Sequence, residues 1–116
     1  MMRKRLLSFK YALGGIYFLF KDQPNAWIHL VAAAGVIVAG YLFHLSAAEW
    51  IFITFAIGFV FCAELINSAI ESLVDKVSPE QHPIAGKIKD LAAGAVLVAA
   101  ITAAVIGLAI FVPKMW

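Results

Sequence analysis

Residues 50–77 read WIFITFAIGFVFCAELINSAIESLVDKV, an apolar stretch that passes without a break into a polar helical pattern. Its first part, from Trp50 to about Ile66, is apolar and long enough to cross the hydrocarbon core of a bilayer. Ser46 precedes it as a plausible N-cap, and Ser78-Pro79 ends it, because proline does not continue a helix. We therefore predict one long helix that crosses the membrane and extends beyond it at its C-terminal end.

Two other apolar stretches, Trp27–Leu45 and Leu91–Val112, are also long enough to cross a membrane. The chain has 116 residues, of which 64% are hydrophobic and 14% charged, unlike an ordinary soluble domain. A chain this short cannot hide so much apolar surface in a water-soluble core. We predict one all-α integral membrane domain, residues 1–116, with three transmembrane helices within 27–45, 50–77 and 90–112.

The segment before the first span has an amphipathic pattern. Over residues 5–21, apolar side chains such as Phe9, Leu13 and Phe20 recur at helical spacing, while the lysines occupy other directions. This pattern predicts an N-terminal helix that lies in the membrane interface with its lysines toward anionic head groups. Pro24 then ends the helix, and residues 78–88 are predicted to form a polar connection before the third span.

The basic residues are distributed unevenly between the two ends of the predicted spans. Of the 9 lysines and arginines, all but Lys114 fall on the side of the N-terminus and of the 78–88 connection. The positive-inside rule therefore places the N-terminus and this connection in the cytoplasm and the turn at 46–49 outside. The formal net charge is only +2, which gives no indication of a nucleic-acid-binding surface.

A line of polar residues runs along the cytoplasmic half of the second predicted span. Glu64, Asn67, Glu71 and Asp75 are spaced i, i+3, i+7 and i+11 and fall within about 80° on one helix face. Asp75 and Glu71 could simply be solvated at the helix end. Glu64 lies well inside the apolar stretch, where a carboxylate must face protein, water or a metal. Glu71 and Asp75 could bind Mg²⁺, and Glu64 could act as a general base.

A second polar cluster precedes the third predicted span. Lys87, Lys89 and Asp90 lie where we expect that helix to begin, and lysines at a helix start can bind a phosphate. Alternatively, they serve as topology signals that contact lipid phosphates. His29 and His44 lie near the two ends of the first span and are interpreted as interfacial polar residues. Together the clusters would suit phosphoryl transfer to a lipid hydroxyl, or equally an ion or proton pathway.

Small residues recur every four positions in the third predicted span. They are Ala95, Ala99, Ala103 and Gly107. Such a stripe allows helices to approach closely. It is compatible with a homo-oligomer, and internal packing of one protomer explains it about as well.

Two motifs resemble those of a known family, the small bacterial diacylglycerol kinases and undecaprenol kinases. Residues 64–75 read ELINSAIESLVD and match E-x-x-N-[ST]-A-I-E-x-x-x-D, while residues 86–92, GKIKDLA, carry the family's K-D pair. Residues 9–15, FKYALGG, agree more weakly. With an amphipathic helix and three spans in a chain of this length, the resemblance covers essentially the whole sequence.

The resemblance implies a homotrimer in the bacterial cytoplasmic membrane that transfers the γ-phosphate of ATP, accompanied by Mg²⁺, to a lipid alcohol. It implies active sites shared between neighbouring subunits. By motif match, Glu64 is the general base and Glu71 a ligand of the Mg²⁺, with Asn67 and Asp75 completing the site by hydrogen bonds. The residues implied to engage the nucleotide are Tyr11, Glu80, Gln81, His82, Lys89 and Asp90.

One position departs from the family pattern. A metal-binding glutamate typically follows the amphipathic helix, and Gln23 stands there in this chain. An amide adds no charge and binds Mg²⁺ more weakly than a carboxylate, although the neighbouring Asp22 could substitute for it. The prediction is a lipid kinase acting on undecaprenol or diacylglycerol. The alternative is a non-enzymatic small membrane oligomer, such as an ion pathway or an assembly protein.

Overall fold

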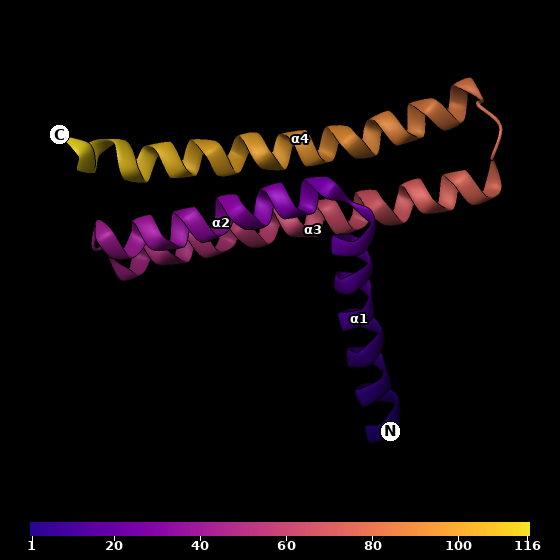
Figure 1. Ribbon diagram of the computed structural model, residues 1–116, viewed down its shortest axis with the longest axis horizontal. Coiled ribbons are helices and arrows are strands. Elements are labelled where there is room, and N and C mark those ends of the chain that lie inside the picture. The colour runs from indigo at the N-terminus through magenta and orange to yellow at the C-terminus, as the bar shows by residue number, and fades with distance from the viewer.

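The computed structural model describes residues 1–116 and is built from helices. They are α1 (Met2–Asp22), α2 (Pro24–Leu42), α3 (Ala47–Val77), α4 (Pro83–Phe111) and the short 3-10 helix η1 (Val112–Met115). The helices α2, α3 and α4 run alongside one another, and α1 projects from them as a separate arm (Figure 1). Three segments are long and apolar enough to cross a membrane, namely Pro24–Leu42, Ala47–Val77 and Pro83–Met115. The prediction of an all-α protein with three spans is confirmed.

The start of α3 is fixed by a capping box. The Glu49 backbone N–H donates to Ser46 Oγ at 3.2 Å, and the Ser46 backbone N–H donates to Glu49 Oε1 at 2.9 Å. These two bonds satisfy donors that the first helical turn leaves without partners. Lys114 Nζ also lies 3.0 Å from Glu49 Oε1 and so ties the end of the chain to this turn. The predicted N-cap is confirmed, and α3 ends at Val77 as expected.

The helix α2 begins and ends three residues earlier than predicted from the sequence. Pro24 takes the first helical position, where its missing N–H is not needed, so only Gln23 separates α2 from α1. At the other end His44 adopts a left-handed conformation with φ 56°. The Leu45 backbone N–H then donates to Gly40 O at 3.1 Å, which closes the helix before the predicted end at Leu45.

The helix α4 also begins earlier than predicted, and the expected polar connection over 78–88 is wrong in its second half. Pro83 again occupies the start of the helix, and His82 caps it, with Nδ1 accepting from the Ile84 backbone N–H at 3.1 Å. Lys87 and Lys89 consequently lie inside α4, beyond the turn whose N–H groups are free. The expected phosphate site, in which these lysines lie at the helix start beside its free N–H groups, is therefore not formed.

The elbow between α1 and α2 is held by aromatic contacts. Trp27 Nε1 donates to Phe20 O at 2.7 Å, and the rings of these residues lie edge to face with centroids 5.2 Å apart. The Phe20 ring also lies 5.9 Å from that of Phe61 on α3. Leu19 and Ala26, on either side of the elbow, are buried. The end of α1 is thereby fixed to the other helices.

Most of the apolar surface of the spans remains exposed in a single chain. The most apolar windows of the three spans are only 17%, 22% and 11% buried. Of the small-residue stripe, Ala99 is fully buried, Ala95 is exposed, and Ala103 and Gly107 line a groove described below. Part of the stripe is thus used inside the protomer, and the homotrimer remains a prediction.

Gly40 provides a prediction about stability because Trp50 packs directly against it. A Cβ at this position would lie 2.5 Å and 2.9 Å from two atoms of the Trp50 ring, which is itself packed against Tyr41. We expect Gly40→Ala to lower the free energy of unfolding by about 1–3 kcal/mol, as overpacking does. Gly35→Ala is the matched control on the same helix, since nothing lies within 4 Å of its Cβ position. Thermal unfolding followed by circular dichroism in detergent tests this, and equal midpoints would contradict the packing.

Candidate active site

The polar line on α3 contains buried oxygen atoms without hydrogen-bond partners. Glu64 is only 3% exposed, although it lies within the apolar part of the span. Its Oε1, together with Asn67 Oδ1 and Ser68 Oγ, has no hydrogen-bond partner in the protein. Polar groups that are buried in this way normally find partners, and those left over often mark a functional site. The line continues outward through Glu71, which is half-buried, to Asp75, which is exposed.

His29 on α2 lies against Glu64. The distance from His29 Nε2 to Glu64 Oε1 is 2.9 Å, close enough for an ion pair, although the ring N–H is not directed at the oxygen as a hydrogen bond. The contact places an imidazole nitrogen against the buried carboxylate. The interpretation of His29 as a merely interfacial residue missed this contact. Its presence within an apolar helix was the available signal.

Gln23 and Glu71, which the resemblance links to the metal, are brought together. Gln23 is the single residue between α1 and α2, and its Nε2 donates to Glu71 Oε2 at 3.3 Å. Asp22 lies beside it, exposed, on the last turn of α1. Nowhere in the chain do three or more side chains of His, Cys, Asp or Glu lie close enough together to hold a metal ion by themselves. Mg²⁺ in nucleotide sites typically takes one or two protein carboxylates and completes its shell with phosphate and water oxygens. The Glu71 carboxylate therefore fits such an ion, whereas Gln23 turns its amide nitrogen, not its oxygen, toward Glu71.

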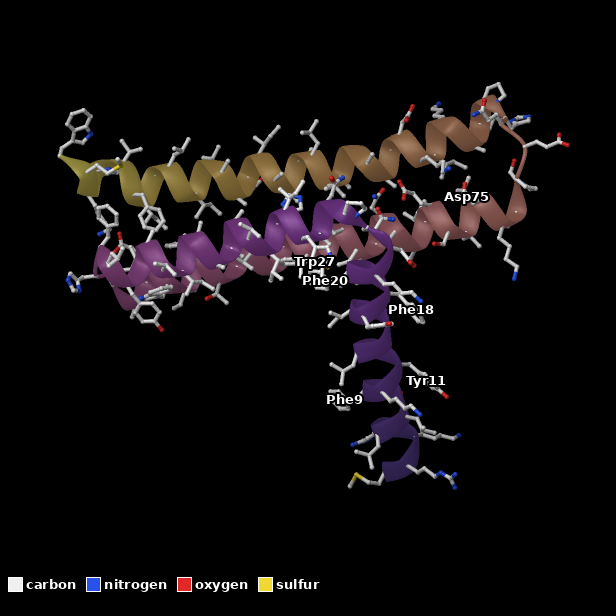
Figure 2. All side chains as sticks on the ribbon, viewed as in Figure 1. Phe9, Tyr11, Phe18, Phe20, Trp27 and Asp75 are labelled. Atoms are coloured by element: carbon white, nitrogen blue, oxygen red, sulfur yellow. The ribbon has the colours of Figure 1, made fainter.

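A polar hollow of about 630 Å³ lies where α3 meets α4. It is lined by the last turns of α3, the connection over residues 78–82 and the first turns of α4. Five residues that the resemblance assigns to the site line this hollow, namely Asp75, Glu80, Gln81, His82 and Lys89. Lys89 Nζ forms an ion pair with Asp75 Oδ1 across it. Asp75 is labelled in Figure 2 on the part of α3 that extends toward this connection.

Two of the predicted nucleotide residues do not meet the others in a single chain. Tyr11 is 71% exposed on the projecting arm of α1, well away from Asp75 (Figure 2). Asp90 is exposed and does not line the hollow, although it follows Lys89 directly. The remaining members occupy one continuous band, from Glu64 through Asn67 and Glu71 to the hollow.

An apolar groove of about 520 Å³ lies between α2, α3 and α4. Of its 15 lining residues 13 are hydrophobic, and many are small, such as Ala33, Ala56 and Gly107. His29 also lines the groove, and because it contacts the buried Glu64, the groove lies close to that carboxylate. An apolar groove, a buried carboxylate and a polar hollow thus occur together on one three-span protein. This is the arrangement needed by a membrane-embedded enzyme that brings a lipid to a polar reactant.

Sequence comparisons identify the class. The sequence profile of the prokaryotic diacylglycerol kinase family matches residues 10–111, and the chain belongs to this family. It is similar to the undecaprenol kinase of Bacillus subtilis, with 44% identity over 108 residues, covering 93% of this chain and 88% of the relative. It is 40% identical over 111 residues to a diacylglycerol kinase of Synechocystis, covering 95% of this chain but 63% of that longer protein.

A third relative is the diacylglycerol kinase of Escherichia coli K12, which is 34% identical over 96 residues, 76% of this chain and 78% of the relative. The chain is therefore a lipid kinase of a bacterial membrane. The prediction of a lipid kinase is confirmed, and the non-enzymatic alternative is set aside.

Proposed function

We propose that the protein transfers the γ-phosphate of ATP to the hydroxyl of undecaprenol or diacylglycerol at the cytoplasmic face of the membrane. The observation that carries this proposal is the position of Glu64. It is a buried carboxylate in contact with His29, beside an apolar groove, and on the helix face that leads to the polar hollow. A lipid alcohol needs an apolar surface and a phosphate donor needs a polar one. The two could react only at a position between these surfaces, such as that of Glu64.

The polar hollow is the proposed nucleotide site. Its volume of about 630 Å³ falls within the usual range for small-molecule pockets. Lys89 supplies a positive charge for the phosphates, and the Asp75 partner holds its ammonium group in place. Glu80, Gln81 and His82 offer polar groups along the connection for the rest of the nucleotide.

Glu71 and Gln23 would hold the Mg²⁺ that accompanies ATP, about two helical turns from Glu64 and about one turn from Asp75, which lines the hollow. When bound, the ion would neutralise charge on the phosphate oxygens. For Gln23 to take part, its amide must turn so that the oxygen faces the ion, because its nitrogen now faces Glu71. This requirement makes Gln23 a weaker contributor than Glu71.

Glu64 is the proposed general base. The lipid hydroxyl approaches along the apolar groove, and its O–H proton passes to the Glu64 carboxylate as the oxygen bonds to the γ-phosphorus. The bond from that phosphorus to the bridging oxygen of ADP breaks in the same transfer. The Asn67 amide, one turn along the same face, can orient the hydroxyl or a phosphate oxygen through its side chain.

The proposed assembly is a homotrimer with sites shared between subunits. Two observations support it: the exposed apolar surface of the spans and the distance of Tyr11 from the hollow in one chain. A neighbouring subunit could supply Tyr11, and could cover part of the span surface. If the proposal holds, the largest product of cross-linking in native membranes will contain three chains. A largest product of two chains would contradict it.

The acceptor is tested by offering each lipid alcohol in turn. Purified protein in mixed micelles with ATP and Mg²⁺ would receive undecaprenol or a diacylglycerol at matched mole fractions. We expect one of the two to be phosphorylated with the higher kcat/KM, which identifies the acceptor. If neither lipid accepted phosphate while a soluble alcohol did, the proposed lipid substrate would be wrong.

The cytoplasmic position of the site gives a prediction about topology. In a Cys62→Ala background, which removes the single native cysteine, Ala47→Cys should react with an impermeant maleimide added to intact cells. Gln81→Cys should react only after the cells are opened, because the basic residues hold that side in the cytoplasm. Both positions are exposed in the structure, so access depends on sidedness alone. Labelling of Gln81→Cys in intact cells would place the hollow on the side without ATP.

A further inference from the structure

We infer that His29 is a positioning residue that holds the Glu64 carboxylate and accepts the proton that Glu64 takes from the lipid alcohol. The inference rests on the proposed role of Glu64 as general base, and it extends that role by saying where the proton goes. His29 lies on α2, and the sequence motifs on α3 and α4 do not include it.

The contact is the only close charged interaction that Glu64 makes. The ion pairs of the chain are His29 with Glu64, Lys89 with Asp75, and Lys114 with Glu49. The next acidic residue along α3, Glu71, is already bonded to Gln23. On α1, Lys21 instead lies over the Tyr17 ring, with Nζ 6.0 Å from its centroid.

The groove beside His29 is lined by no other titratable side chain. The helix α4 brings only alanine, glycine, leucine and phenylalanine to the groove beside it, and α3 brings aliphatic residues, Phe61 and Glu64 itself. The imidazole is thus the one side chain paired with Glu64, and its ring nitrogens can both accept and release a proton.

Burial of Glu64 favours a second proton acceptor in contact with it during repeated turnover. The Glu64 side chain is 4% exposed, whereas that of His29 is 26% exposed and borders the groove. After each transfer the Glu64 carboxyl carries the former hydroxyl proton and must lose it before it can act again. A buried carboxyl group releases its proton most readily to a neighbour that touches it and can accept the proton.

The protonated Glu64 carboxyl gives its proton to Nε2 of the neutral imidazole, which leaves a carboxylate facing an imidazolium at 2.9 Å. The attraction between these opposite charges offsets part of the cost of forming them at a buried position. The imidazolium then loses a proton to water, and exchange with water returns the neutral ring to the tautomer that carries its hydrogen on Nδ1 and leaves Nε2 free for the next turnover.

The test compares His29→Ala and His29→Gln with the wild-type chain in the lipid phosphorylation assay. Glutamine keeps an N–H donor for Glu64 but cannot accept a proton, so it separates holding from proton transfer. His44→Asn is the matched control, because it removes the histidine at the opposite end of α2, and asparagine tolerates the left-handed conformation there. ATP binding and helical content are measured for every variant, so that a misfolded protein is recognised.

We expect both His29 variants to lower kcat by on the order of 10- to 100-fold with an unchanged KM for ATP, a loss typical of a missing proton acceptor. Added imidazole should restore part of the rate in His29→Ala and have no effect on the wild type. A His29→Gln enzyme with the wild-type kcat, or a folded His29→Ala enzyme that imidazole does not restore, would overturn the inference. Full activity of Glu64→Gln would instead show that the proposed role of Glu64 has failed.

Discussion

Replacing Glu64 with glutamine is expected to slow phosphoryl transfer by on the order of 10²–10⁴-fold, the usual loss when a general base is removed. Glutamine has nearly the same shape as glutamate, so packing in this buried position should be retained. ATP should bind with close to its normal affinity, because the polar hollow lies beyond Glu64 along α3. The measurement is kcat with saturating lipid and nucleotide, together with an ATP-binding titration of the same preparation.

Glu49→Gln is the matched control for this change. It also converts a glutamate of α3 to glutamine, but at the opposite end of the helix, where glutamine can still form the capping box. Its only expected loss is the contact with Lys114, so its kcat should equal that of the wild type. A Glu64→Gln enzyme with undiminished turnover would remove Glu64 from the mechanism. A variant that fails to assemble would assign it a structural role instead.

The second large effect is expected at the proposed metal site. Glu71→Ala should abolish Mg²⁺-dependent binding of ATP. Of the two side chains proposed to hold the ion, Glu71 and Gln23, only Glu71 carries a charge. The metal-free protein should keep its stability to within about 1 kcal/mol, the usual worth of the single hydrogen bond that is lost. Isothermal titration with ATP, in the presence of Mg²⁺ and of EDTA, measures the difference. Equal ATP affinity with and without Mg²⁺ would contradict the metal-assisted mechanism.

Gln23→Glu is expected to act in the opposite direction. It would place two carboxylates where an amide and a carboxylate now meet at 3.3 Å. In EDTA the variant should therefore unfold at a lower temperature than the wild type, because the like charges repel. With Mg²⁺ and ATP the order should reverse as the second carboxylate binds the ion. Asn25→Glu, two residues away and exposed, is the matched control and should show neither effect.

Patterns confined to one helix could be predicted from the sequence. The spacing of Glu64, Asn67, Glu71 and Asp75 places them on one face whatever surrounds the helix, and their position within an apolar run indicated that they face a site. The capping box at Ser46 is equally local, since both of its partners lie within four residues. These features depend only on helical geometry.

Contacts between helices could not be predicted in this way. The distance between His29 and Glu64, or between Gln23 and Glu71, depends on how α2 is rotated and shifted against α3. Periodicity within either helix does not determine this. The helix starts at Pro24 and Pro83 were missed for another reason. In the sequence analysis Pro24 ends a helix and Pro83 falls within the expected polar connection, although proline is also common at the first position of a helix.

The central claim is that phosphate passes from ATP to a membrane lipid alcohol at the polar line of α3. The most direct measurement incubates the purified protein with γ-labelled ATP, Mg²⁺ and the acceptor lipid in mixed micelles, and follows both products. We predict that label appears in the lipid extract in a one-to-one ratio with the ADP released, and that Glu64→Gln suppresses both together. Release of ADP without labelled lipid, or labelled lipid formed equally well by Glu64→Gln, would contradict the account.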